Sequence, residues 1–218
     1  MNAREKILAR IRAAQGKPQE ASAEERGRVQ SHLAAHPQSP RPRIGDDLGS
    51  QFRTRALALS STVEEIGALA EAPQAVAGYL SRNALPLSAV CWPELAALDW
   101  ATAGMRVEAR AARDGDLVGV TGAFCAIAET GTLMLLTGPD TPAATSLLPE
   151  THIALLRVDR IVAGMEEAWQ LLRVEHPSLP RAVNFVSGPS RTADIEQTVT
   201  LGAHGPYRAH VILVGRGA

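Results

Sequence analysis

The chain has 218 residues, of which 45% are hydrophobic and 21% charged, and its formal net charge is −1. This length and composition are ordinary for a globular protein with a sizeable core. The near-neutral charge and an aromatic content of 4% argue against a nucleic-acid-binding protein, which needs a basic surface or stacking platforms. Apolar runs are too short for a membrane span, and the charged, amphipathic first residues are unlike a signal peptide, so we expect a cytoplasmic protein.

Cysteine and lysine usage excludes several kinds of chemistry. Cys91 and Cys125 are the only cysteines and form no CxxC pair, so the chain cannot by itself ligate an iron–sulfur cluster or a four-cysteine zinc ion. The only lysines are Lys6 and Lys17, which argues against a P-loop or a Schiff base in the rest of the chain. GxGxxG and paired-histidine motifs are absent, so we expect neither a Rossmann dinucleotide site nor a metal site.

Residues 1–45 are predicted to form a helical N-terminal arm with a proline-rich linker, and residues 46–218 a separate α/β domain. Asn2 can cap a helix that runs to about Ala14, and a second helix can form near residues 20–28. The stretch HPQSPRPR that follows has the composition of an extended linker. The sequence leaves open whether the arm packs on the α/β domain, packs on a partner or is a mobile tail.

The sequence of residues 46–218 predicts alternating helices and buried strands. Seven short apolar runs are bounded by Gly, Pro or Asp: LSAVCW, MRVEA, DLVGVTG, TLMLLTG, HIALLRV, AVNFVSG and HVILVG. Helices are expected at residues 47–59, 72–83, 93–98, 141–147, 163–172 and 192–198. The stretch STVEEIGALAE fits either a capped helix or a short strand. Nearly continuous apolar strands indicate an α/β fold whose sheet is covered by helices on both faces.

Polar clusters directly follow three of the apolar runs. VTG ends at Gly122, LTGPDTP at Pro142 and VSGPSRT at Thr192. In α/β folds, ligands bind at the carboxyl ends of the parallel strands. We therefore expect these clusters to share one rim.

Glu129 is a single acid between two apolar segments, and Thr130, Gly131 and Thr132 follow it. A carboxylate in this position can act as a general base or nucleophile, or can hold a ligand hydroxyl. It can equally accept backbone N–H bonds and hold a turn in place. Both interpretations remain open.

The stretch SGPSRTADIE has the elements of an anion-binding site. Gly188 permits a close backbone approach, and Ser190 or Thr192 can cap a following helix whose N–H groups would point at a ligand beside Arg191. Alternatively, Ser190 caps the helix, Arg191 pairs with an acid of the same stretch, and nothing binds. In the next cluster, GAHGP, His204 can carry a proton or donate to a ligand, or can be satisfied by the backbone.

The blocks GVTGAFCAIAETGTLML, LLPETHIALL, RIVAGMEEA, VNFVSGPSRTADIE, LGAHGP and HVILV together resemble the lactate utilisation protein C family, the LUD domain, over roughly residues 46–215. The resemblance implies a sheet like that of the NagB/RpiA/CoA-transferase group. It also implies a role in oxidising L-lactate to pyruvate alongside partner subunits that carry iron–sulfur clusters. The motif positions carried over to a ligand site are Thr121, Gly122, Glu129, Thr130, Gly131, Thr132, Ser187, Gly188, Ser190, Arg191, Thr192, Asp194, Glu196, Gly202, His204, Gly205 and Pro206.

The leading hypothesis is an accessory subunit without a cofactor of its own that binds a small anion. Arg191 and nearby N–H groups would hold a carboxylate or phosphate, while Glu129 and His204, the catalytic candidates, would orient hydroxyls or move a proton. This hypothesis requires Glu129, Arg191 and His204 to meet around a single cavity. The alternatives are a CoA-transferase-like enzyme with Glu129 as nucleophile, and a non-catalytic scaffold or regulatory subunit.

Overall fold

The computed structural model describes residues 2–18, 20–192 and 200–215. The chain divides into two compact units, Met1–Arg41 and Pro42–Ala218, the second of which we call the body. Within the described residues, no helix combines the length and the apolar character needed to cross a membrane.

The N-terminal unit contains two capped helices, α1 (Ala3–Ala14) and α2 (Ala23–Ala35). Asn2 accepts a hydrogen bond from the N–H of Glu5, and the Glu5 carboxylate accepts one from the N–H of Asn2, which together form a capping box. Ser22 and Glu25 form the same box at the start of α2. The prediction of a first helix capped by Asn2 is confirmed. Neither helix has a buried residue.

The body is built on a six-stranded sheet in which every neighbouring pair is parallel. In sheet order its strands are β1 (Thr62–Ile66), β12 (Arg208–Val214), β7 (Thr151–Arg157), β4 (Val118–Gly122), β2 (Ser88–Cys91) and β3 (Arg106–Ala109). The stretch from residue 61, which fitted either a helix or a strand, therefore begins with a strand. Apolar runs form the inner strands β12, β7, β4 and β2 because both faces of the sheet are buried there.

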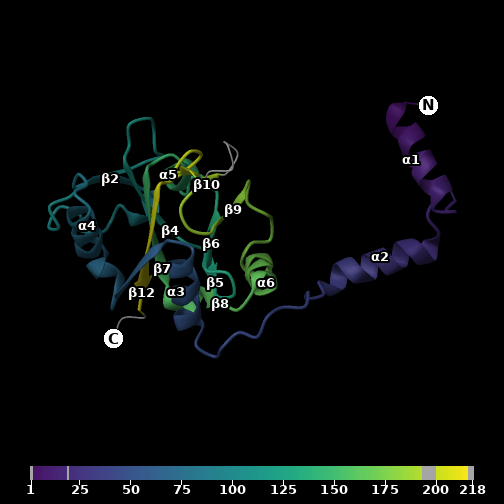
Figure 1. Cartoon of the computed structure of the whole chain (residues 1–218), viewed down its shortest axis with the longest axis horizontal. Helices are drawn as coiled ribbons and strands as arrows, with labels where there is room; N and C mark the ends of the chain where they lie inside the picture. The colour runs from purple at the N-terminus through teal and green to yellow at the C-terminus, as the bar shows by residue number, and fades with distance from the viewer. Residues whose placement is uncertain (1, 19, 193–199, 216–218) are drawn as a thin grey trace. The chain divides into compact units, whose positions relative to one another are not determined.

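Two apolar cores cover the two faces of this central sheet. On one face, Ile153 and Leu155 of β7 pack in a core that includes residues of α4. On the other face, Ala154 and Leu156 pack against α3 and a second sheet. In Figure 1, α4 lies to the left of the central sheet, and the second sheet and α6 lie to its right. The predicted α/β layering is confirmed.

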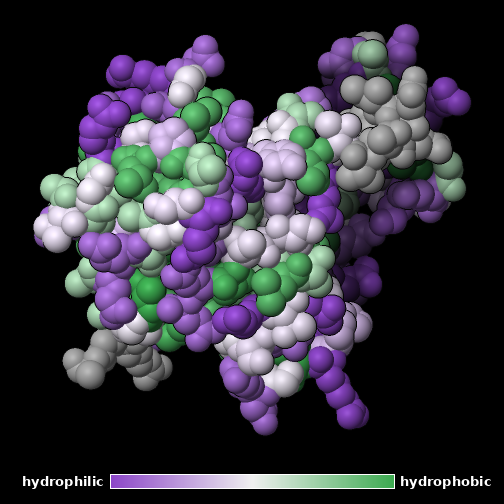
Figure 2. All heavy atoms as spheres, turned by 60° about the vertical axis from the view of Figure 1, so that its left-hand side comes forward, coloured by the Kyte–Doolittle hydropathy of each residue, from purple (hydrophilic) through white to green (hydrophobic). Residues whose placement is uncertain are grey.

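The helices of the body are α3 (Leu48–Ala58), α4 (Ala72–Arg82), α5 (Ala144–Leu147) and α6 (Met165–Glu175). Short 3-10 helices occupy Leu69–Glu71, Pro93–Leu95 and Val158–Arg160. On the face shown in Figure 2, apolar side chains form small groups among polar ones, which is ordinary for a protein surface.

The second sheet has four strands and was not predicted as a separate sheet. Its order is β8 (Ile161–Val162), β5 (Cys125–Ile127), β6 (Thr132–Leu136) and β9 (Val183–Val186). β5–β6 and β6–β9 are antiparallel, and β5–β8 is parallel. Only Ala123 and Phe124 separate β4 from β5, so the chain passes directly from one sheet to the other.

The helix expected over residues 192–198 is wrong at its start. Arg191 and Thr192 form β10, which pairs antiparallel with β11 (Thr200–Leu201). Strand pairing places the backbone of Thr192 in a ladder, so its N–H does not open a helix there. The rest of that expected helix, residues 193–199, lies outside the described residues.

Candidate functional site

A chain of three hydroxyl groups joins the ETGT and SGPSR motifs. The Oγ1 atoms of Thr130 and Thr132 are 2.7 Å apart, and Thr132 Oγ1 lies 2.7 Å from Ser187 Oγ. This contact follows from topology: β6 and β9 are antiparallel, so the residue after β9 lies beside the residue that starts β6. Ser187 therefore meets the beginning of β6, whereas the predicted rim placed it beside the end of that strand.

Two glycines bring these motifs against the C-terminal end of α3. Gly131 has φ 69°, and a Cβ added to it would lie 2.6 Å from the backbone nitrogen of Ala56. Gly188 has φ 83°, and its added Cβ would overlap the carbonyl oxygen of Leu59. Only glycine tolerates both the left-handed backbone and the close approach. The close backbone approach expected at Gly188 is thus made to a helix of the same chain.

Arg191 also contacts the end of α3. Its Nη2 donates to the carbonyl oxygen of Leu59 at 2.7 Å and to Ser60 Oγ at 2.5 Å. A carbonyl at a helix C-terminus lacks an intrahelical donor, so the guanidinium satisfies an otherwise unpaired acceptor. Part of its hydrogen-bonding capacity is therefore used within the protein.

Glu129 lies at the turn between β5 and β6. Its backbone N–H donates to the carbonyl oxygen of Ala163 at 3.0 Å, and its side chain is partly buried. The turn is closed by a hydrogen bond from the N–H of Gly131 to the carbonyl oxygen of Ile127 at 2.9 Å. The backbone of the turn is thus held by its own hydrogen bonds.

Thr121 faces the interior of the body. Its Oγ1 lies 2.8 Å from Nε2 of His152, and both side chains are buried. Burial lowers the pKa of His152 to about 4, so the imidazole is neutral at pH 7. Thr121 and His152 form a neutral hydrogen-bonded pair in the core.

Gly122 ends β4 at the carboxyl edge of the central sheet, where sequence reasoning missed two neighbours. A Cβ on Gly122 would lie 2.5 Å from Oε1 of Glu94 and 3.7 Å from the ring of Trp92. Trp92 Nε1 donates to the carbonyl oxygen of Pro142 at 3.1 Å. The predicted clusters that end at Gly122 and Pro142 therefore do meet, with Trp92 and Glu94 between them.

The environment of Glu94 disfavours its negative charge. Burial of the carboxyl group raises its pKa, and the nearby charge of Asp140 raises it further. The residue as a whole is still exposed, so this is a carboxyl group at the edge of the sheet rather than in the core. In the sequence, Glu94 could have been noticed as an acid directly after the Trp-Pro pair that follows β2.

The GAHGP motif lines a separate pocket of about 780 Å³. Its loop residues Gly202, His204 and Gly205 contribute one wall. Leucines 147, 148 and 201 give the pocket an apolar lining, and Glu150, Tyr207 and Arg208 supply polar groups. Ligand pockets typically have volumes of about 300–1,000 Å³, so this one is large enough for a small molecule.

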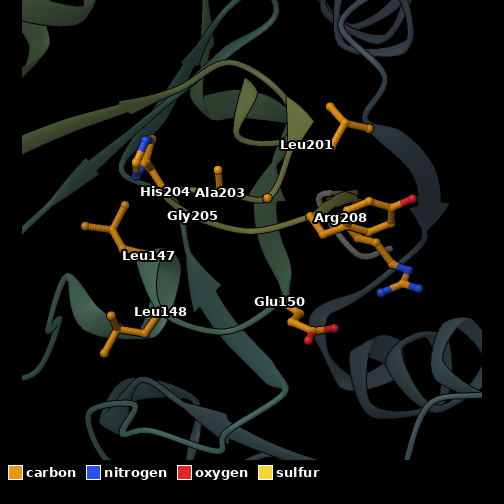
Figure 3. Close-up of a pocket in the computed structure, with 10 residues that line it drawn as sticks. Leu147, Leu148, Glu150, Leu201, Ala203, His204, Gly205 and Arg208 are labelled. Atoms are coloured by element: carbon orange, nitrogen blue, oxygen red, sulfur yellow. The ribbon is translucent and has the colours of Figure 1, made fainter. Parts of the chain in front are cut away.

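In the view of Figure 3, His204 and Arg208 lie on opposite sides of the pocket, with Glu150 below Arg208. The Arg208 guanidinium carbon lies 5.0 Å from the centre of the Tyr207 ring. Among the described residues, no carboxylate lies within ion-pair distance of Arg208. Sequence reasoning missed Arg208 and Glu150 because they lie at the amino ends of β12 and β7, where no ligand site was expected.

Ser190 connects the pocket loop to the SGPSR motif. Its backbone N–H donates to the carbonyl oxygen of Pro206 at 2.9 Å, and its carbonyl oxygen accepts from the N–H of Gly202 at 2.9 Å. A Cβ on Gly205 would lie 3.3 Å from the Ser190 Cβ. The ETGT, SGPSR and GAHGP motifs therefore form one continuous set of contacts.

The three residues expected around one cavity have different surroundings. His204 is exposed and lines the pocket, but neither Glu129 nor Arg191 is among the residues that line it. Arg191 contacts α3 instead. Asp194 and Glu196 lie outside the described residues. Within the described part of the chain, no group of three or more His, Cys, Asp or Glu residues is arranged to hold a metal ion.

The fold and these motif blocks define the class of protein. Residues 3–214 match the model of the LUD domain, and the chain belongs to this family. The match begins within α1, so it includes the N-terminal unit as well as the body.

Several known proteins are similar to this chain. "Lactate utilization protein C" of Anoxybacillus flavithermus is 38% identical over 97 residues, which cover 44% of this chain and 43% of the relative. The protein of the same name from Bacillus subtilis is 38% identical over 100 residues, covering 44% and 42%. The chain thus aligns with less than half the length of these curated relatives. A crystal structure of a DUF162 family protein from Deinococcus radiodurans matches with a TM-score of 0.59 and 30% identity, covering 80% of this chain and all of that one.

Proposed function

We propose that the protein takes part in lactate utilisation, as an accessory subunit that works with iron–sulfur partner proteins in the oxidation of L-lactate to pyruvate. The LUD domain match over residues 3–214 and the names of the similar proteins support this proposal. The oxidation releases two electrons and two protons. Two cysteines alone cannot ligate an iron–sulfur cluster, so the electrons pass to the partner subunits.

The contribution of this chain is to bind the small carboxylate in the pocket beside GAHGP. The observation that carries this proposal is the guanidinium of Arg208, which lines the pocket without a carboxylate partner among the described residues. An arginine fork matches the two oxygens of a carboxylate. The Tyr207 ring lies next to the guanidinium and limits its freedom before the ligand arrives.

The other polar groups of the pocket favour a 2-hydroxy acid. Glu150 also lines the pocket, and its carboxylate can accept a hydrogen bond from a ligand hydroxyl but repels a second carboxylate. His204 presents an imidazole that can exchange a proton with the same hydroxyl. L-Lactate has one carboxylate and one hydroxyl, whereas pyruvate lacks the hydroxyl donor. We therefore expect L-lactate to bind more tightly than pyruvate.

Titration calorimetry of the full chain with L-lactate, pyruvate and acetyl-CoA tests the proposal. Arg208→Gln should weaken L-lactate binding by about 10- to 150-fold, because charged hydrogen bonds contribute about 1.5–3 kcal/mol. Arg106→Gln is the matched control. Arg106 also begins a strand at the amino edge of the central sheet, but it lies four strands away, at about 4.8 Å per strand. Equal losses in both variants, or tighter binding of pyruvate, would contradict the proposed pocket.

Two outcomes would favour the alternative functions. An acyl adduct on Glu129 after incubation with acyl-CoA, seen by mass spectrometry and absent in Glu129→Gln, would favour acyl transfer. A scaffold would be favoured by two results together. None of the three ligands would bind, and lactate oxidation reconstituted with the iron–sulfur partners would still depend on this chain.

A further inference from the structure

The outer strands of the two sheets differ in how well they are protected. In the central sheet, β1 carries Glu64 and Glu65, and β3 carries Arg106 and Glu108. In the second sheet, β8 has only two residues. β9 has four residues and no charge, with the sequence VNFV. Charges and short length protect an edge strand from pairing with other chains, so β9 is the unprotected edge among the described strands.

The register of β9 shows which of its backbone groups are unpaired. The N–H of Thr137 donates to the carbonyl oxygen of Ala182 at 3.0 Å, and Leu135 faces Asn184 in the same ladder. Hydrogen-bonded pairs alternate along an antiparallel ladder, so residues 182, 184 and 186 point their N–H and C=O groups toward β6. Val183 and Phe185 therefore point theirs away from β6, at the open edge of the sheet.

Exposed apolar side chains lie on β9 and in the segment that leads into it. Phe185 is 37% exposed, although its ring also packs edge-to-face on Trp169, with the ring centres 5.7 Å apart. Leu179, in the connection that leads into β9, is 69% exposed. The edge thus combines unpaired backbone groups with apolar side chains, the two features of a strand that pairs with another chain.

We propose that β9 pairs antiparallel with β9 of a second copy of this chain. The two outward-facing residues allow a self-complementary register in which Val183 of each copy faces Phe185 of the other. This register makes four backbone hydrogen bonds around a two-fold axis at Asn184. It places apolar Val–Phe pairs on one face and two Asn side chains opposite each other on the other face.

A second copy fits this edge better than a charged partner does. β9 carries no charge, so it offers nothing for a charged strand to pair with, and two copies of β9 do not repel each other. The proposed pairing would join two four-stranded sheets into one of eight strands across the dimer. No residue of β9 lines the proposed lactate pocket, which lies at the amino ends of β7 and β12. The dimer proposal therefore stands or fails independently of the ligand.

Sedimentation velocity of the full chain over a wide concentration range tests the dimer. We expect the native protein to have the mass of two chains and Val183→Pro the mass of one. The proline removes an N–H that faces away from β6, a position at which edge strands tolerate proline. Circular dichroism checks that the variant is folded. A native protein that is monomeric at every concentration, or a dimer that persists in folded Val183→Pro, would overturn the proposal.

A cysteine variant tests the register itself. Two Asn184 residues at a non-hydrogen-bonded position would have Cα atoms about 4.5 Å apart, within the range of about 4.4–6.8 Å that a disulfide spans. Asn184→Cys should therefore form a linked dimer on mild oxidation. Leu179→Cys is more exposed but does not face itself, so it should stay unlinked. No link at position 184, or equal linking at both, would overturn the register, and this result stands even if Val183→Pro does not fold.

Discussion

Replacing Gly188 by alanine should destabilise the body by about 2–5 kcal/mol. The left-handed φ of 83° would cost an L-residue about 1–2 kcal/mol. The new Cβ would also overlap the carbonyl oxygen of Leu59 and lie 3.3 Å from its carbonyl carbon, and such overpacking costs about 1–3 kcal/mol. Backbone atoms cannot rotate aside as a flexible side chain does, so a shift of α3 or of the loop is required.

Gly104→Ala is the matched control, because Gly104 has φ 73° but nothing within 4 Å of an added Cβ. This variant should lower the free energy of unfolding only by the cost of the left-handed backbone conformation, about 1–2 kcal/mol. For a domain of this size, each kcal/mol lost from the free energy of unfolding lowers Tm by about 2–4 °C. Thermal unfolding followed by circular dichroism should therefore show a fall in Tm of about 4–20 °C for Gly188→Ala and about 2–8 °C for the control. Equal drops would refute the close approach to α3.

Three further predictions follow from buried or paired groups. Burial lowers the pKa of both His152 and His210 to about 4, so the unfolded chain binds two extra protons below about pH 6.5. Each histidine should lower the free energy of unfolding by about 3 kcal/mol between pH 6.5 and 4, and His152→Gln should remove about half of this slope in urea titrations. Arg191→Gln should cost about 1 kcal/mol in the same titrations and leave the heat of L-lactate binding unchanged, because the guanidinium donates its hydrogen bonds to the end of α3. Burial raises the pKa of Cys91 and Cys125 to about 11, so both thiols should resist Ellman's reagent at pH 8 until the protein unfolds.

The parts of the fold that depend on local chemistry could be predicted from the sequence. The side chains of Asn2 and Asp47 cap their helices by accepting a hydrogen bond from the backbone N–H three residues later. The strands β7 and β12 are buried on both faces, which requires a run of apolar residues that is visible in the sequence. Each of these predictions needed only the neighbouring residues.

Elements that depend on distant partners could not be predicted. The stretch from Thr62 fits a capping box, but it forms a strand because it pairs with β12, where Thr62 contacts His210 across 148 residues. β5 and β8 have three and two residues, too few to show a period. They exist because β6 lies beside β5 and completes the second sheet.

The candidate site was only partly predictable for the same reason. The prediction of one rim assumed that every strand belongs to one parallel sheet, whereas β6 and β9 lie in an antiparallel one. Ser187 consequently meets Thr132 at the start of β6. Arg208 opens β12 at the amino edge, where the rule for ligand sites in parallel sheets gave no reason to look.

The two-residue passage from β4 to β5 affects how the body can come apart. The N–H of Ala123 donates to the carbonyl oxygen of Leu155 in the central sheet at 3.1 Å, and the N–H of Phe124 donates to that of Met134 in the second sheet at 2.9 Å. Because the connection is only two residues long, unfolding of one sheet would disrupt the hydrogen bonds of the other, and we expect the two sheets to unfold together. Far-ultraviolet and near-ultraviolet circular dichroism of the body should therefore be lost together in a single cooperative transition.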